Sequence, residues 1–144
     1  MIRRATADDA LTVAEMAIKM WTSHSAAELA EDFRELMSST ECAVFIMYSA
    51  DVPVGFAQCQ LRHDYVEGTE SSPVGYLEGI YVDESHRRQG CARALLAACQ
   101  NWAKEQGCRE FASDCELTNA ESLVFHLKMG FIEANRIICF KKDI

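Results

Sequence analysis

The sequence predicts an α/β fold in which a mixed central sheet is flanked by four helices, all in one domain over residues 1–144. Apolar runs of strand length alternate with longer stretches in which apolar residues recur every three or four positions. Helical stretches follow the strands expected at Gly75–Val82 and Arg109–Asp114, and such helices usually connect parallel strands. Two prolines, no repeat and no linker leave nothing that would divide the domain.

The first quarter of the chain is predicted to be mainly helical. A short strand at Ile2–Arg4 precedes a helix with Thr6 as its N-cap, and Asp8 and Asp9 suit the dipole of its first turn. The apolar face of this helix runs to its end near residue 21: Leu11, Ala14, Ile18 and Trp21. Ser25-Ala26-Ala27-Glu28 forms a capping box that opens a second helix. The buried side of that helix is expected to be Leu29, Phe33, Leu36 and Met37.

Three strands are predicted to follow. Cys42–Tyr48 is an apolar run closed by the turn Ser49–Pro53, and Val54–Leu61 is its expected antiparallel partner. The polar stretch His63–Pro73 is predicted to be a loop before the third strand, Gly75–Val82.

The last third is predicted to alternate between helix and strand. A helix begins at Cys91 with one apolar face: Ala92, Leu95, Leu96, Cys99, Trp102 and Ala103. Arg109–Asp114 is a short strand, and Thr118-Asn119-Ala120-Glu121 is a second capping box. The helix that it opens should bury Leu123, Val124 and Leu127. A final strand is predicted over Phe131–Lys142, centred on Ile137–Phe140.

Charge limits the possible partners. The 14 Lys and Arg residues against 22 Asp and Glu give a net charge of −8. Such a surface repels phosphate backbones and anionic lipids, so we expect no nucleic acid and no membrane as partner. A polycationic small molecule matches the sign of the charge.

The seven cysteines favour buried free thiols. Their number is odd and no Cys-x-x-Cys pair occurs, so the sequence predicts neither a disulfide framework nor a metal site. The basic start Met1–Arg4 is followed by Asp8 and Asp9 instead of an apolar signal core, and no apolar run reaches the ~20 residues of a membrane span. We therefore expect a cytoplasmic protein.

The segment Arg87-Arg88-Gln89-Gly90-Cys91-Ala92 lies between a strand and an amphipathic helix. Small residues allow close approach of a ligand, and the first amides of the helix together with the arginines, Arg93 included, would attract an anion. The single glycine excludes the dinucleotide fingerprint, and no Gly-Lys-Ser/Thr follows. An exposed basic turn with Gly90 as a hinge is an equally good interpretation.

This segment, after Ile80-Tyr81-Val82 and before a helix, resembles the acetyl-CoA signature of the GNAT acetyltransferase superfamily. Asn119 and the Met129-Gly130-Phe131 corner match it too. The chain is more closely similar to type I aminoglycoside 6′-N-acetyltransferases in four further segments. These are Arg62-His63-Asp64-Tyr65-Val66, Ser71-Ser72-Pro73-Val74, Leu77-Glu78-Gly79-Ile80-Tyr81-Val82 and Glu110-Phe111-Ala112-Ser113-Asp114.

The resemblance implies a GNAT fold with two splayed parallel strands and an acetyl-CoA site between them. Backbone groups of Ile80, Tyr81 and Val82 would pair with the pantetheine arm, and Asn119 would contact the cofactor. The pyrophosphate would lie on Arg88, Gln89, Gly90, Cys91, Ala92 and Arg93. An amide near Gly79 could stabilise the oxyanion. Relatives form homodimers, which implies the same for this chain.

The resemblance also implies an acceptor site for aminoglycosides, made by Trp21, Tyr65, Glu78 and Asp114. Asn135 stands where some relatives have a further acidic residue. Each residue also has a simpler interpretation: a core tryptophan, a surface tyrosine, a water-facing strand glutamate and a capping aspartate. Glu78 is conspicuous by itself, because a carboxylate in an apolar strand is costly unless it is paired or solvated.

The implied reaction is direct attack of a 6′-amine on the thioester, giving antibiotic resistance, with Glu78 taking the proton of the attacking amine. His126, seven residues after Asn119, stands where many relatives have a general acid, and packing is an equally good interpretation of it. Covalent catalysis by Cys91 is disfavoured, because its thiol would lie beside the pyrophosphate. The alternatives are acetylation of a polyamine or a protein lysine, or a non-catalytic acyl-CoA-binding module.

Overall fold

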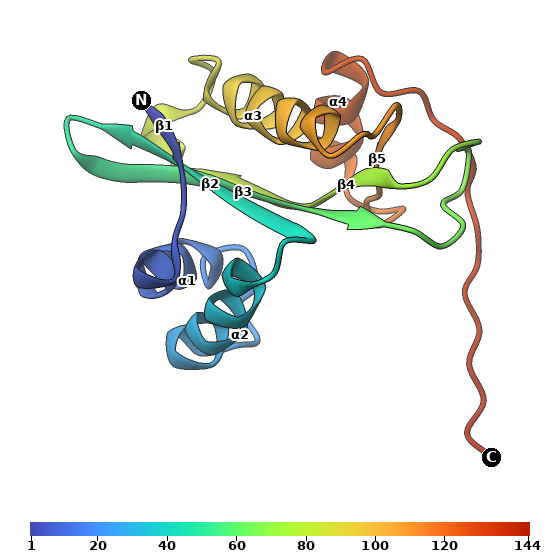
Figure 1. Cartoon of the computed structure of the whole chain (residues 1–144), viewed down its shortest axis with the longest axis horizontal. Helices are drawn as coiled ribbons and strands as arrows, with labels where there is room; N and C mark the ends of the chain where they lie inside the picture. The colour runs from blue at the N-terminus through green and yellow to red at the C-terminus, as the bar shows by residue number, and fades with distance from the viewer.

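The computed structural model describes all 144 residues and shows a five-stranded sheet with helices on both faces. Helices α1 and α2 cover one face, and α3 and α4 lie over the other (Figure 1). The strands are β1 (Ile2–Arg4), β2 (Cys42–Ser49), β3 (Val52–Arg62), β4 (Val74–Val82) and β5 (Phe111–Ser113). The helices are α1 (Ala10–Ala17), α2 (Ala26–Ser38), α3 (Cys91–Glu105) and α4 (Ala120–Lys128), with 3₁₀ turns η1 (Ala7–Asp9) and η2 (Glu84–His86). None of the helices is both long and apolar enough to cross a membrane.

The sheet is mixed, as the sequence predicted. Its order is β1-β2-β3-β4-β5. The pairs β1–β2, β2–β3 and β3–β4 are antiparallel. The pair β4–β5 is parallel, because α3 carries the chain across the sheet between these strands. The α/β class with a mixed sheet and four helices is therefore confirmed.

Two apolar cores lie on the two faces of the sheet. Successive side chains of β2 point to opposite faces, so that Val44 and Ile46 pack with α1 and α2 while Ala43 packs with α3. The buried side of α3 is the predicted one except for Ala92, which is half-buried: Leu95, Leu96, Cys99, Trp102 and Ala103. The sheet is thus packed between two layers of helix.

The helix termini confirm one predicted cap and correct another. Ser25 accepts the N–H of Glu28 at 3.2 Å, which completes the predicted capping box of α2. Helix α4 is capped by Asn119, one residue later than predicted, because its side chain accepts the N–H of Ser122 at 3.1 Å. Helix α1 ends at Ala17 and leaves Leu11 half exposed. Its buried side is Ala10, Val13, Ala14, Met16 and Ala17.

The predicted final strand over Phe131–Lys142 is wrong. Residues 131–144 form no strand, and beyond Asn135, which still contacts Glu67, the segment runs away from the body of the molecule (Figure 1). A strand needs a neighbour to satisfy its backbone groups, and no other part of the chain pairs with this segment. Val124 and Leu127 of α4, predicted to be buried, are also half exposed. The C-terminal end therefore presents much apolar surface.

Four of the seven free cysteines are buried, in line with their position in apolar runs: Cys42, Cys59, Cys99 and Cys108. Burial raises the pKa of the Cys42 and Cys108 thiols, which keeps them protonated and unreactive. Cys91 is half-buried at the start of α3, and Cys115 and Cys139 are exposed.

Asp9 fastens the N-terminal strand to the first helical turn. Its carboxylate accepts both Arg3 guanidinium nitrogens at 2.7 and 2.8 Å and the Thr6 N–H at 2.8 Å. The bond from Arg3, opposed by partial burial, is the main reason why the pKa of Asp9 falls from 3.8 to about 2. The ionised form therefore stabilises the fold above pH 3.8, and this contribution disappears as the pH falls toward 2.

We expect Asp9→Asn to lower the free energy of unfolding by about 1 kcal/mol at pH 7, because the ion pair is partly solvated. The difference from the wild type should shrink as the pH falls from 3.8 toward 2, since unfolding then protonates the wild-type carboxylate and, near pH 2, the folded state loses this charge as well. Urea unfolding at pH 7 and at pH 2.5 measures this. An equal difference at both pH values would contradict it.

Candidate functional site

Strand β4 is interrupted by a bulge at Glu78. Leu77 pairs with Cys59 and Gly79 pairs with Gln58, so Glu78 is an extra residue between two consecutive pairs. Leu77 and Ile80, three residues apart, consequently pack on the same core. The bulge re-aims the side chains of β4 in the middle of the sheet.

The parallel pair β4–β5 separates at the same place. Its ladder has three pairs and ends with Leu77 opposite Ser113. Beyond that point β4 pairs only with β3, through Ile80, Tyr81 and Val82. The backbone groups of β4 that face β5 are therefore open to an extended ligand, in the manner of an added strand.

The turn from η2 into α3 has an unusual backbone. Arg88 has φ of +61° and Gly90 has φ of +82°, and a side chain is seldom tolerated in this region. Arg87 ties the turn to the end of β4, because its Nε donates to the Val82 carbonyl at 3.1 Å. Gln89 Nε2 donates to the Ser85 carbonyl at 3.3 Å, so the side chain of Gln89 is also bonded within the turn.

A cavity of about 390 Å³ opens over this turn. Its lining is Val82, His86, Arg87, Arg88, Gly90, Cys91, Ala92, Arg93 and Met129. The first intrahelical bond of α3 runs from the Ala94 N–H to the Gly90 carbonyl, so the preceding N–H groups have no partner in the helix. A Cβ on Gly90 would meet no atom within 4 Å. Free amides, three arginines and open space are the features with which a helix N-terminus can bind an anion.

Asn119 has a structural task in this protein. Its Oδ1 accepts the Ser122 N–H as the cap of α4. The residue is otherwise exposed, so its Nδ2 stays available for a ligand. A contact between Asn119 and a cofactor would therefore be made by Nδ2.

The two predicted carboxylates, Glu78 and Asp114, belong to one chain of contacts. Arg62 of β3 donates to Glu78 Oε1 at 2.8 Å, and its guanidinium carbon lies 3.4 Å from the centre of the Tyr76 ring. The Tyr76 hydroxyl donates in turn to Asp114 Oδ2. Burial, and then the bond to Asp114, raise the pKa of Tyr76. The phenol is therefore a fixed donor.

Sequence reasoning missed Arg62 and Tyr76. Tyr76 lies two positions before Glu78 in the same strand, which is a local signal for a shared face. Arg62 has no such signal, because its pairing with Glu78 depends on the register of β3 against β4 and on the bulge.

Trp21 borders the same region while remaining part of the core. It is half-buried and stacks on Phe33 with ring centres 6.4 Å apart. A Cβ on Gly79 would come within 2.9 Å of the Trp21 ring. The ring is therefore a wall beside Glu78, held in place by the core behind it.

Tyr65 and Asn135 meet at a different point, the carboxylate of Glu67. The Tyr65 hydroxyl donates to Glu67 Oε2 at 3.2 Å and Asn135 Nδ2 donates to Oε1 at 3.1 Å. All three residues are exposed. The structure thus brings Tyr65, in the loop between β3 and β4, together with Asn135 of the C-terminal segment, and no direct contact links them to Glu78.

His126 lies on the face of the sheet that α3 and α4 cover. Its Nδ1 lies 2.6 Å from the Ser122 carbonyl, which can only accept, so this nitrogen carries a proton. In the neutral ring, Nε2 then accepts the Ser113 hydroxyl at 2.7 Å. Ser113, at the end of the β4–β5 ladder, was not among the predicted residues. The ring packs against Phe125 and Phe131.

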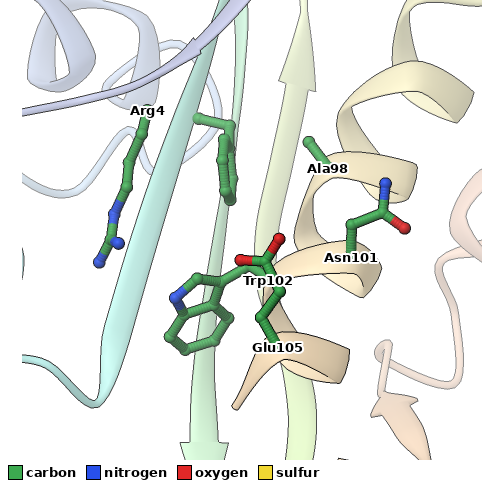
Figure 2. A pocket seen from close by; sticks show the side chains of 6 residues that line it. Arg4, Ala98, Asn101, Trp102 and Glu105 are labelled. Carbon is green, nitrogen blue, oxygen red and sulfur yellow. The ribbon is translucent and has the colours of Figure 1, made fainter.

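A second hollow, of about 250 Å³, lies at the opposite end of α3. Figure 2 shows side chains of α3 on one side of it and Arg4 of β1 on the other. It is lined by Arg4, Phe45, Ala98, Asn101, Trp102 and Glu105. It contains none of the predicted site residues.

Known proteins resemble this chain over nearly its whole length. A sequence model of the acetyltransferase (GNAT) family matches residues 10–131. An aminoglycoside N(6′)-acetyltransferase type 1 of Stenotrophomonas maltophilia is 43% identical over 144 residues, which cover 99% of this chain and 93% of that protein. A protein of the same name from Serratia marcescens is 43% identical over 126 residues, or 87% and 86% of the two chains.

Solved structures agree with these matches. AAC(6′)-Iy in complex with the bisubstrate analog CoA-S-monomethyl-acetylneamine has a TM-score of 0.95 at 37% identity, covering 100% of this chain and 98% of that one. The apo aminoglycoside 6′-N-acetyltransferase AAC(6′)-IG of Acinetobacter haemolyticus has a TM-score of 0.94 at 36% identity, covering 100% and 99%.

Proposed function

This chain belongs to the acetyltransferase (GNAT) family, and from this premise we propose that it acetylates the 6′-amino group of aminoglycoside antibiotics with acetyl-CoA, thereby conferring resistance. The observation that carries the proposal is the separation of β4 from β5. An anion site adjoins it on one side, and the linked carboxylates Glu78 and Asp114 adjoin it on the other. The whole chain acts as one acetyltransferase domain.

The described residues fit acetyl-CoA. The cavity over the Arg88–Gly90 turn offers amides and guanidinium groups to a pyrophosphate, and the open edge of Ile80–Val82 offers backbone groups to the amides of pantetheine. The side chain of Tyr81 is occupied by its bond to Asp83 at 2.8 Å, which leaves the backbone for this task. The thioester of bound acetyl-CoA supplies the acetyl group.

The acceptor side fits a polycation. Glu78 is 23% exposed within an otherwise apolar strand, and Asp114 is exposed at the end of β5. An aminoglycoside carries several ammonium groups on rigid rings, so carboxylates both attract and orient it. The Trp21 ring supplies a flat wall beside them, and Tyr65 and Asn135 lie at the rim.

Glu78 is the proposed base. An ammonium group has no lone pair, so a proton must leave the nitrogen before it attacks the thioester carbon, and Glu78 takes this proton directly or through water. The backbone amides freed by the bulge lie next to Glu78 and can stabilise negative charge that develops on the thioester oxygen. The carbon–sulfur bond then breaks, coenzyme A leaves as a thiolate that takes a proton from solvent, and the new amide nitrogen releases its extra proton to solvent. No cysteine takes part.

Incubation with tobramycin and acetyl-CoA tests the function. We expect one acetyl group on the 6′-nitrogen, located by NMR, with stoichiometric thiol release. An aminoglycoside with a 6′-hydroxyl should be inert. More efficient use of a polyamine or a lysine peptide would contradict the aminoglycoside assignment. Coenzyme A binding without turnover of any amine would favour a non-catalytic binding module.

His126→Phe is expected to keep acetyl-CoA binding and most of the turnover. Both ring nitrogens of His126 already bond within the protein, and Phe fills the same space against Phe125 and Phe131. Steady-state kinetics and calorimetry measure the two quantities. A fall in turnover of roughly 100-fold with intact binding would instead make His126 the general acid.

We also propose that the protein is a homodimer in which the segment 131–144 of each chain packs on the other. Large apolar side chains of this segment are almost fully exposed in the single chain, with Ile132 and Phe140 each at 90%. The half-exposed Val124 and Leu127 of α4 offer apolar surface of the same kind. The match to AAC(6′)-Iy covers the full length of this chain, so this segment has a counterpart there.

Sedimentation of the wild type and of a variant ending at Phe131 tests the dimer. We expect a dimer for the wild type and a monomer for the shortened chain, with Ile138→Ser plus Phe140→Ser weakening association in the full-length chain. A monomeric wild type, or a shortened chain that still dimerises, would refute the proposal.

The exposed free thiols Cys115 and Cys139 favour a reducing compartment, and we propose the cytoplasm.

A further inference from the structure

Arg62 is the one cation in direct contact with the acceptor carboxylates. Its guanidinium donates to Glu78 Oε1 at 2.8 Å and stacks 3.4 Å above the Tyr76 ring, whose hydroxyl donates to Asp114. A planar guanidinium can lie flat on the ring while one of its nitrogens donates to the carboxylate, and an ammonium has no plane to stack in this way. Through these two contacts Arg62 connects Glu78 to Asp114, which are 36 positions apart in the sequence.

The arrangement is not the one that stability alone would favour. The Nε–H of Arg62 is buried and has no hydrogen-bond partner, and an unsatisfied buried donor costs free energy. The ion pair with Glu78 is partly solvated, since the two side chains are 37% and 23% exposed. It therefore adds little to the free energy of unfolding. Local costs of this kind are typical of functional positions.

The ion pair between Arg62 and Glu78 also changes the charge that an acceptor amine encounters. A single oxygen of Glu78 bonds to Arg62, so its second oxygen, Oε2, is free of this pair. A positive group at this point holds the carboxylate in place and reduces the net negative charge of the acceptor side. An incoming ammonium group must therefore share Glu78 with a resident cation.

We propose that Arg62 is a positioning residue for acetyl transfer. It fixes Glu78 through Oε1 and leaves Oε2 to take the proton of the acceptor amine. Its positive charge also weakens the attraction of the site for polycations, so that the product can leave. This inference rests on the proposed function. Its distinctive consequence is that loss of Arg62 affects turnover and drug affinity in opposite directions.

Three variants test the inference. Arg62→Met keeps a long stem without charge, and Arg62→Lys keeps the charge without the planar fork. Arg34→Met is the matched control, because Arg34 forms an ion pair with Glu31 at the same 2.8 Å on the exposed side of α2. For Arg62→Met we expect kcat with tobramycin to fall about tenfold or more, since a misplaced base is costly.

In the same variant the dissociation constant of tobramycin, measured by calorimetry at low salt, should be lower than in the wild type. Arg62→Lys should restore the wild-type affinity and only part of kcat. Arg34→Met should match the wild type in both. The inference is overturned if Arg62→Met equals Arg34→Met in kcat, or if kcat and affinity fall together.

A thermal double-mutant cycle provides a reading that needs no substrate. The Tm losses of Arg62→Met and Glu78→Gln should be less than additive when the two are combined, because each removes the attraction between the same pair of opposite charges. Additive losses would overturn the coupling and with it the inference. If the wild type acetylates no aminoglycoside, the proposed function fails, and this cycle together with tobramycin binding still decides whether Arg62 holds Glu78.

Discussion

Glu78→Gln should lower kcat with tobramycin by roughly 100-fold or more, while acetyl-CoA affinity stays unchanged. Gln has the shape of Glu and can still accept the hydrogen bond from Arg62, but it cannot take a proton from the attacking amine. The cofactor cavity lies at the start of α3 and contains no atom of Glu78. Thiol release at fixed ionic strength and calorimetry with acetyl-CoA separate the two effects.

Asp114→Asn is the matched partner of that variant. Asn keeps an oxygen that can accept the Tyr76 hydroxyl, so the local geometry survives while one negative charge is lost. We expect the tobramycin dissociation constant to rise about tenfold, with a smaller effect on kcat, because one charge-assisted contact is removed. If both variants acetylated tobramycin at the wild-type rate, neither carboxylate would belong to the acceptor site.

Gly90→Val should weaken acetyl-CoA binding by about tenfold or more. Gly90 has φ of +82°, a conformation that a β-branched residue adopts only with strain. Relief of this strain would displace the amides at the start of α3, and a side chain would also enter the open space over the turn. Calorimetry with acetyl-CoA measures the loss.

Gly107→Val supplies the control at the other end of the same helix. Gly107 has φ of +90° and, like Gly90, no atom within 4 Å of the position of a Cβ. Both variants should therefore lose similar stability, and only Gly90→Val should lose cofactor affinity. Arg88→Ala should act in the same direction through the lost guanidinium. Unchanged affinity in Gly90→Val and Arg88→Ala would refute the cofactor site.

Much of the fold could be predicted because its signals are local. The capping box at Ser25 and the apolar face of α3 depend on residues within a few positions of each other, and both were predicted correctly. The segment from Phe131 to Lys142 has strand-like composition, and it was assigned wrongly. Its conformation depends on whether another strand lies beside it, which composition does not reveal.

The sequence by itself determined the α/β class, the glycine turn with its arginines before α3, and the presence of a carboxylate at Glu78 in an apolar strand. These follow from periodicity, charge and backbone freedom within short windows of sequence. Only the tertiary structure decided that Glu78 meets Arg62, that Tyr76 meets Asp114 and that Ser113 meets His126, across 16, 38 and 13 positions respectively. Such contacts depend on strand register, and the single extra residue in β4 shifts that register at the place where the site forms.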